Sequence, residues 1–93
     1  MEIEFHKNAV KALKKLSPKD TQKIRTKLLT LLNSLEETGV VASGELDIKA
    51  LEGNWQGFFR MRVGKLRVIF RIDAEQEILY IYNLGSRGNI YKN

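Results

Sequence analysis

The stretch Gly57–Ile72 reads GFFRMRVGKLRVIFRI and has the pattern of a β-hairpin. Apolar residues alternate with arginines on both sides of Gly64-Lys65, and this period of two is typical of strands with one buried face. Two residues between strands are the usual length of a tight hairpin turn. The sequence therefore predicts two antiparallel strands, roughly 57–63 and 66–72.

The turn also predicts which side chains share a face. If Gly64-Lys65 is the turn, Val63 pairs with Leu66 and Arg62 pairs with Arg67. Side chains alternate in direction along a strand. One face, expected to form the core, contains Phe59, Met61, Val63, Leu66, Val68, Phe70 and Ile72. The other face, which we call the arginine face, contains Phe58, Arg60, Arg62, Arg67, Ile69 and Arg71.

The arginine face has an unusual charge pattern, because Gly57–Ile72 contains five basic residues and no acid. Like charges directly opposite each other in a sheet destabilise it by a few tenths to about 1 kcal/mol per pair. A single exposed arginine would indicate only a solvated surface. Four on one face indicate a phosphate-binding surface, because planar guanidinium groups form bidentate contacts with phosphate.

The rest of the chain predicts a strand and two helices before the hairpin, and one more strand after it. Glu2–Phe5 alternates like a short strand, and a helical pattern begins at Lys7. Ser17-Pro18 is typical of a helix start, so a second helix is expected from there to about Leu35. Residues 38–47 are expected to form a loop, 48–53 (IKALEG) a bridge, and 78–84 the last strand.

These elements predict an α+β fold. It consists of an N-terminal strand, an α-helical hairpin and a three-stranded antiparallel meander, with the helices packed on one face of a twisted sheet. The opposite sheet face is expected to be partly open. At 93 residues, 43% of them hydrophobic, the chain is expected to be one domain spanning residues 1–93.

Composition narrows the function classes. The chain has no cysteine and one histidine, His6, so disulfides and Cys or His metal sites are not expected, nor is a cofactor. No signal segment or membrane span is evident, which favours a cytoplasmic location without a membrane partner. The net charge of +5 favours an anionic partner. Eight of the sixteen Lys and Arg residues lie in the segment 7–27.

Four motifs, in their order and spacing, resemble the RelE/ParE toxin superfamily of bacterial type II toxin–antitoxin systems. They are LEG (51–53), FFRMRVG (58–64), LRVIFRID (66–73) and LGSRGNIY (84–91). The resemblance covers nearly the whole chain and is closer to the RelE branch. It implies a RelE-like fold and an endoribonuclease that needs no metal, cleaves mRNA in the ribosomal A site and so inhibits translation.

The resemblance also implies roles for individual residues. Arg67, Arg87 and Tyr91 match the catalytic positions: the two arginines would stabilise charge on the phosphate, and Tyr91 would orient or deprotonate the 2′-hydroxyl or stack on a base. The positions expected to hold the RNA backbone are Arg60, Arg62, Lys65 and Arg71. Those expected to contact ribosomal RNA are Lys11, Lys14, Lys15 and Lys23.

Two positions depart from the family pattern. The best-known members carry lysine at one or both of the positions of Arg60 and Arg62, and arginine effectively never loses its proton. Many relatives have histidine where this chain has Ser86. The general base is therefore left open.

The expected partners are a RelB-like or other small, labile antitoxin, mRNA and the ribosome with its 16S rRNA; operator DNA would be reached only through the antitoxin. A ParE-like toxin that poisons DNA gyrase without being an enzyme is an alternative, as is an inert RNA-binding relative.

Outside the arginine face, His6 is expected to be structural or exposed. Trp55 and Phe58 could anchor a loop or stack on bases.

Overall fold

The predicted hairpin is the centre of a five-stranded sheet in the computed structural model, which describes residues 1–39 and 46–86. β3 (Phe59–Val63) and β4 (Leu66–Asp73) pair antiparallel, with Val63 opposite Leu66 and Arg62 opposite Arg67. Gly64 has a φ of 62°, which suits the first central position of a two-residue turn. The predicted turn and register are confirmed.

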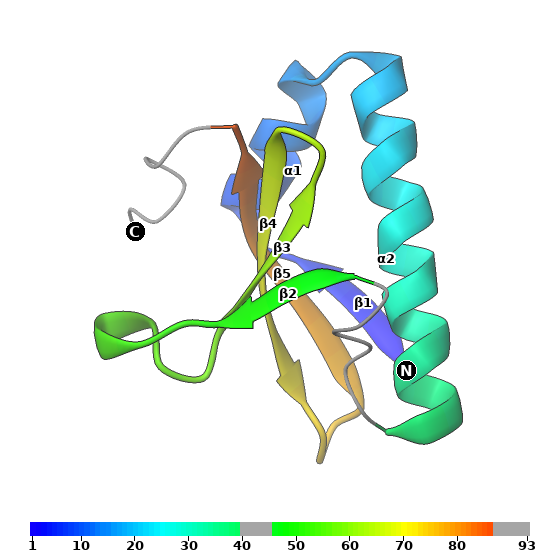
Figure 1. Cartoon of the computed structure of the whole chain (residues 1–93), viewed down its shortest axis with the longest axis vertical. Helices are drawn as coiled ribbons and strands as arrows, with labels where there is room; N and C mark the ends of the chain where they lie inside the picture. Colours follow the sequence, from blue (N-terminus) through cyan, green and yellow to red (C-terminus); the bar gives the residue numbers. More distant parts are fainter. Residues whose placement is uncertain (40–45, 87–93) are drawn as a thin grey trace.

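The remaining strands extend the sheet on both sides of this hairpin. β5 (Ile78–Gly85) pairs antiparallel with β4, and β1 (Glu2–Phe5) pairs parallel with β5, so the strand order is β1-β5-β4-β3-β2 (Figure 1). Parallel pairing of β1 and β5 needs a long connection, which the two helices and the other strands provide. The predicted meander is confirmed.

One prediction about the middle of the chain is wrong. Asp47–Ala50, expected to belong to a loop and a bridge, forms the edge strand β2, which pairs antiparallel with β3. A short 3₁₀ helix, η1 (Gly53–Trp55), follows it. Four residues without an aromatic side chain carry little strand signal of their own. They become a strand because the free edge of β3 offers hydrogen-bond partners.

The helical hairpin is confirmed, with caps at both helix starts. α1 (Lys7–Lys15) begins after His6, whose Nδ1 accepts a hydrogen bond from the backbone N–H of Asn8 at 3.1 Å. α2 (Pro18–Thr38) begins after Ser17, whose Oγ accepts from the N–H of Asp20. α2 runs three residues beyond the predicted end and stops at Gly39, which has a φ of 71°.

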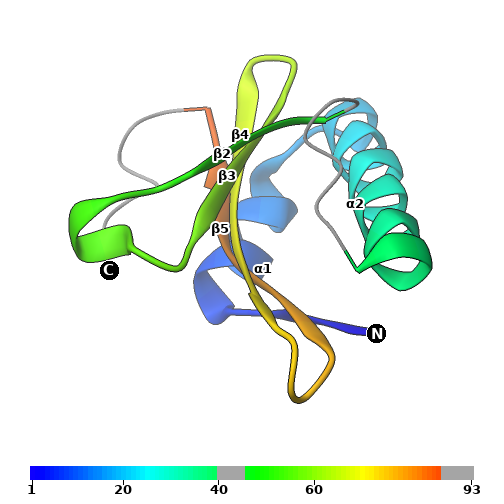
Figure 2. The same cartoon turned by 60° about the horizontal axis from the view of Figure 1, so that its bottom comes forward.

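The core lies between the helices and one face of the sheet. The predicted core residues Met61, Val68 and Phe70 are fully buried and pack with Leu31 of α2 and Ala9 of α1. Figure 2 shows α2 running beside the sheet. The helices therefore leave the arginine face uncovered. Within the described residues, no helix combines the length and hydrophobicity that a membrane crossing needs.

The Ser17 cap gives a direct test of the helix start. We expect Ser17→Ala to lower the free energy of unfolding by about 1 kcal/mol, because the N–H of Asp20 loses its acceptor. In a domain of this size that shift corresponds to a Tm about 4–8 °C lower, measurable by thermal unfolding. Ser17→Asp keeps an acceptor and should stay close to wild type; equal losses in both variants would contradict the capping role.

Candidate nucleic-acid interface

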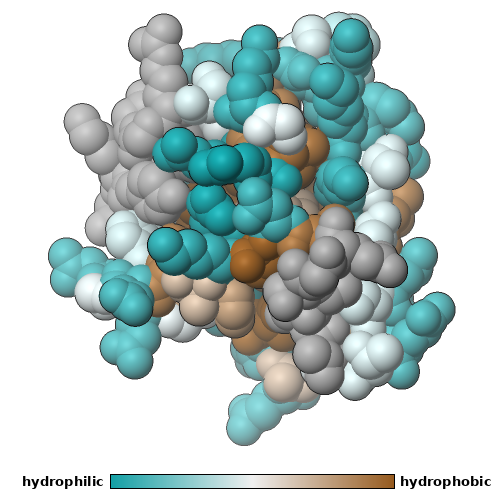
Figure 3. Space-filling view, viewed as in Figure 1, coloured by the Kyte–Doolittle hydropathy of each residue, from teal (hydrophilic) through white to brown (hydrophobic). Residues whose placement is uncertain are grey.

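The arginine face is a row of cations on two adjacent strands. Figure 3 shows hydrophilic residues gathered in front of the central strands, in the view of Figure 1. Arg62 and Arg67 lie directly opposite each other, and Arg60 lies opposite Ile69. This pairing of like charges costs stability, so packing alone does not explain it.

Arg67 is partly buried on β4 beside the turn. Within the described parts of the chain, no carboxylate lies within 4.0 Å of its guanidinium nitrogens. Lys65 in the turn is exposed, as is Arg71 farther along β4. The guanidinium of Arg71 lies 4.9 Å from the centre of the Tyr80 ring, a cation–π contact that orients it. Among the described residues, an anion can thus approach Arg67, Lys65 and Arg71 without displacing a carboxylate.

The segment Gly57–Ile72 itself contains no acid, but a carboxylate from the neighbouring strand β2 partly neutralises this face. Asp47 on β2 lies opposite Arg62, and its Oδ1 accepts a hydrogen bond from Nη2 of Arg60 at 3.0 Å. Its Oδ2 lies 3.9 Å from Nε of Arg62, an ion-pair distance too long for a hydrogen bond. The sequence did not predict this contact, because Asp47 was expected to lie in a loop. The polar–apolar alternation of Asp47-Ile48-Lys49 is the signal that could have identified the strand.

Asp47 divides the arginines into two kinds. The Arg60 side chain is only 14% exposed, and its buried Nε has no hydrogen-bond partner among the described residues. The Arg62 side chain is 49% exposed. A phosphate would have to displace Asp47 to reach Arg60, whereas Arg62 stays accessible. β2 also brings Lys49 opposite Arg60, a cation that sequence reasoning did not assign to this surface.

Aromatic rings occupy the end of the face toward β5. A β-bulge where Ile69 pairs with Asn83 and Phe70 with Ile81 leaves Tyr82 as an extra residue. The Tyr82 ring lies 5.3 Å from Trp55 and 5.8 Å from Phe58. Trp55 and Phe58 are 5.3 Å apart, centre to centre. These contacts hold the loop before β3 against the sheet, so Trp55 and Phe58 anchor this loop, one of the two roles that the sequence left open.

His6 also lies at this end of the face. Its ring is 4.7 Å from Tyr82 and 6.3 Å from Tyr80, centre to centre. Because Tyr80 also contacts Arg71, the histidine is closer to the arginines than its place in the sequence suggested. Its Nδ1 is committed to capping α1, so the predicted structural role is confirmed.

The remaining predicted site residues lie either outside the described residues or on the helices. Arg87 and Tyr91 lie outside the described residues. Lys11, Lys14, Lys15 and Lys23 are exposed on the helices, which cover the opposite face of the sheet. No group of three or more His, Cys, Asp or Glu side chains that could hold a metal ion occurs in residues 1–39 and 46–86.

The match to a family decides what kind of protein this is. The family profile described as "ParE toxin of type II toxin-antitoxin system, parDE" matches residues 3–91. The candidate toxin RelE1 of Methanocaldococcus jannaschii is 32% identical over 91 residues, which cover 98% of this chain and 94% of that protein. The chain belongs to the RelE/ParE toxin superfamily. It is a RelE-like toxin of a toxin–antitoxin system, as the motifs indicated.

Solved structures of relatives share the fold. The RelE–RelB complex from Pyrococcus horikoshii OT3 superposes with a TM-score of 0.68 at 29% identity, covering 94% of each chain. A YafQ mutant from E. coli reaches a TM-score of 0.75 at 17% identity, covering 97% of each chain, and at that identity supports the fold alone. The predicted RelE-like architecture is confirmed.

The Asp47 contacts predict that this acid restrains the anion affinity of the toxin. We expect Asp47→Asn to bind a single-stranded oligonucleotide roughly fivefold more tightly, because one charge that competes with phosphate is removed. The free energy of unfolding should fall by about 1 kcal/mol, because Arg60 loses a charged partner. Fluorescence anisotropy and thermal unfolding measure the two effects.

Glu75→Gln is the matched control, because it removes an equal charge at the exposed β4–β5 turn. It should change neither quantity appreciably. Equal gains in affinity for both variants would mean that net charge, and not the position of Asp47, matters.

Proposed function

We propose that this toxin is a ribosome-dependent endoribonuclease that cleaves mRNA in the A site, uses no metal and thereby inhibits translation. The observation that carries the proposal is the Arg62–Arg67 pair, two opposed guanidinium groups kept accessible at a cost in sheet stability. Membership of the family and the RelE-like character of the relatives support it. Such a reaction takes place in the cytoplasm, where ribosomes translate.

The chemistry requires three events at one phosphate. The 2′-oxygen loses its proton and attacks phosphorus, negative charge builds on the phosphorane oxygens, and the 5′-oxygen leaves with a proton, so that a 2′,3′-cyclic phosphate and a 5′-hydroxyl form. Arg67, with Arg87, would stabilise the charge, since preorganised cations act where charge develops. Tyr91 would orient the 2′-hydroxyl or accept its proton. Arg62 would hold the adjacent backbone.

Cleavage mapping on programmed ribosomes tests this assignment. We expect wild type to cut within the A-site codon and Arg67→Ala or Arg87→Ala to lose about 100-fold or more in rate, the effect of removing one charge-stabilising donor. Tyr91→Phe separates proton transfer from stacking, because phenylalanine retains only the ring. Lys19→Ala, an exposed lysine on α2, is the control and should cut like wild type.

A gyrase poison is the second candidate, because the matching family is described by the name ParE. Such a toxin would arrest growth and induce the SOS response while mRNA stayed intact. That result would overturn the nuclease proposal and leave the arginine face as a docking surface. An inert RNA-binding relative is excluded once wild type cuts and Arg87→Ala does not.

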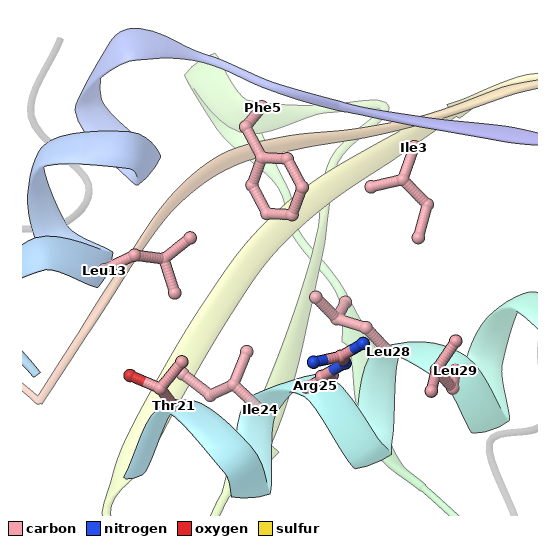
Figure 4. Close-up of a pocket in the computed structure, with 8 residues that line it drawn as sticks. All are labelled: Ile3, Phe5, Leu13, Thr21, Ile24, Arg25, Leu28 and Leu29. Atoms are coloured by element: carbon pink, nitrogen blue, oxygen red, sulfur yellow. The ribbon is translucent and has the colours of Figure 1, made fainter. Parts of the chain in front are cut away.

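A cognate antitoxin of the RelB type, or another small labile protein, is the proposed partner. The toxin has an apolar groove of about 320 Å³ between β1, α1 and α2, and Figure 4 shows its side chains facing one another across it. Phe5 and Leu29 at the groove are 40% and 48% exposed, so the groove opens onto an apolar surface that a partner could cover. Arg25 lines the same groove. An amphipathic antitoxin helix with an acidic residue toward Arg25 fits these features, and relatives of the toxin have been solved as RelE–RelB complexes.

Leu29 gives the test of this docking surface. We expect Leu29→Lys to weaken antitoxin binding at least about tenfold, because burying a leucine contributes roughly 1.5–3 kcal/mol and the lysine ammonium would have to be desolvated. Leu29→Met keeps an apolar side chain of similar volume and should bind like wild type. Calorimetry with the purified antitoxin measures both; equal affinity of the lysine variant would place the antitoxin elsewhere.

A further inference from the structure

A second cationic site lies next to the arginine face, where α2 passes the edge of the sheet. It is a pocket of about 350 Å³ lined by Lys27 of α2, Leu46, Asp47, Arg62 and Gly64. We infer that this pocket, the Lys27 pocket, binds a backbone phosphate of the substrate RNA, so that the strand runs from the cleavage site across the sheet toward α2. The inference rests on the proposed function and adds the path of the substrate to it.

The register of three strands places the pocket in line with the proposed catalytic arginine. Arg67 on β4 lies opposite Arg62 on β3, and Arg62 lies opposite Asp47 on β2. Neighbouring strands are about 4.8 Å apart, so this row spans roughly 10 Å from Arg67 to the sheet edge. Lys27 then adds a cation from the far side of the edge. An extended RNA backbone crossing the strands would therefore meet Arg67 and Arg62 and then pass Asp47 to reach Lys27.

The charges of the pocket favour an anion although Asp47 lines it. Asp47 makes its short contact, 3.0 Å, to Arg60, which does not line the pocket. Its distance to Nε of Arg62 is 3.9 Å, so the other guanidinium donors of Arg62 are not consumed. Lys27 is exposed, and within residues 1–39 and 46–86 no carboxylate lies within 4.0 Å of its ammonium. An ammonium on a flexible stem and a guanidinium fork that line one pocket suit a phosphate.

The chemistry of the other end of the arginine face, toward β5, favours a strand that runs toward α2. There the sheet presents the rings of Trp55, Phe58 and Tyr82, and Glu4 of β1 lies beside Tyr80. These rings suit stacking on bases, and the Glu4 carboxylate repels phosphate, so this end offers weaker phosphate contacts than the end toward α2. Arg71 is the cation at the β5 end, and its guanidinium lies against the Tyr80 ring, whereas Arg62 and Lys27 line one pocket at the end toward α2.

Binding of a 2′-O-methyl RNA dodecanucleotide tests the pocket, because this RNA keeps its phosphates but has no 2′-hydroxyl to cleave. Fluorescence anisotropy over a series of salt concentrations would compare wild type with Lys27→Gln, Lys19→Gln and Arg67→Ala. We expect Lys27→Gln to weaken binding roughly fivefold and to reduce the slope of log affinity against log salt by about 0.7, the loss of one phosphate contact on a single strand.

Lys19→Gln removes the same charge from an exposed position of α2 outside the pocket and should bind like wild type. If Lys27→Gln behaves like Lys19→Gln while Arg67→Ala still binds weakly, the pocket is overturned but the RNA-binding face stands. If Lys27→Gln weakens binding only to ribosomes, the phosphate belongs to ribosomal RNA and the inferred path is wrong. If wild type binds no oligonucleotide, both the pocket and the RNA face are overturned.

Discussion

The register of the β3–β4 hairpin is the constraint on which both the core and the candidate site depend. Gly64 allows a two-residue turn with a positive φ, and that turn sets Val63 opposite Leu66. Because side chains alternate, the same register places Met61, Val68 and Phe70 against the helices and Arg62 and Arg67 on the other face. A shift of one residue would bury the arginines and expose the core, so stability enforces the geometry of the site.

The arginine face combines a cost in stability with a partial compensation. Arg62 and Arg67 repel each other across the ladder. Asp47 on the edge strand β2 supplies a carboxylate that partly neutralises the arginine face. Its short contact goes to Arg60, which is more buried than Arg62, and its longer one goes to Arg62. The more buried cation, Arg60, is thus the one that is neutralised, while Arg62 stays accessible to solvent. A toxin with this face has a chemical reason to be kept with an antitoxin.

The two ends of the face differ in chemistry. Toward β5, a bulge projects Tyr82 into contact with His6, Trp55 and Phe58. Toward β2, the surface continues into the cationic Lys27 pocket. Ile69, between Arg60 and Asn83 in the ladder, is fully buried although it belongs to the outer face, so this face is only partly open, as expected. If the face binds RNA as proposed, this polarity would set the direction of the strand across the sheet.

The sequence by itself determined the elements whose signal is local. Alternation around Gly64-Lys65 was sufficient for the hairpin, its register and the membership of both faces, and the Ser17-Pro18 start was sufficient for α2. The motif order was sufficient for the family. Only the tertiary structure decided the role of Asp47–Ala50, because four residues become a strand only beside a free edge. It likewise decided that Asp47 pairs with Arg60, that Lys27 and Arg62 share a pocket, and that His6 lies near Tyr82. Each of these contacts joins residues far apart in the chain, and their proximity follows from how the sheet and helices pack, which no local pattern encodes.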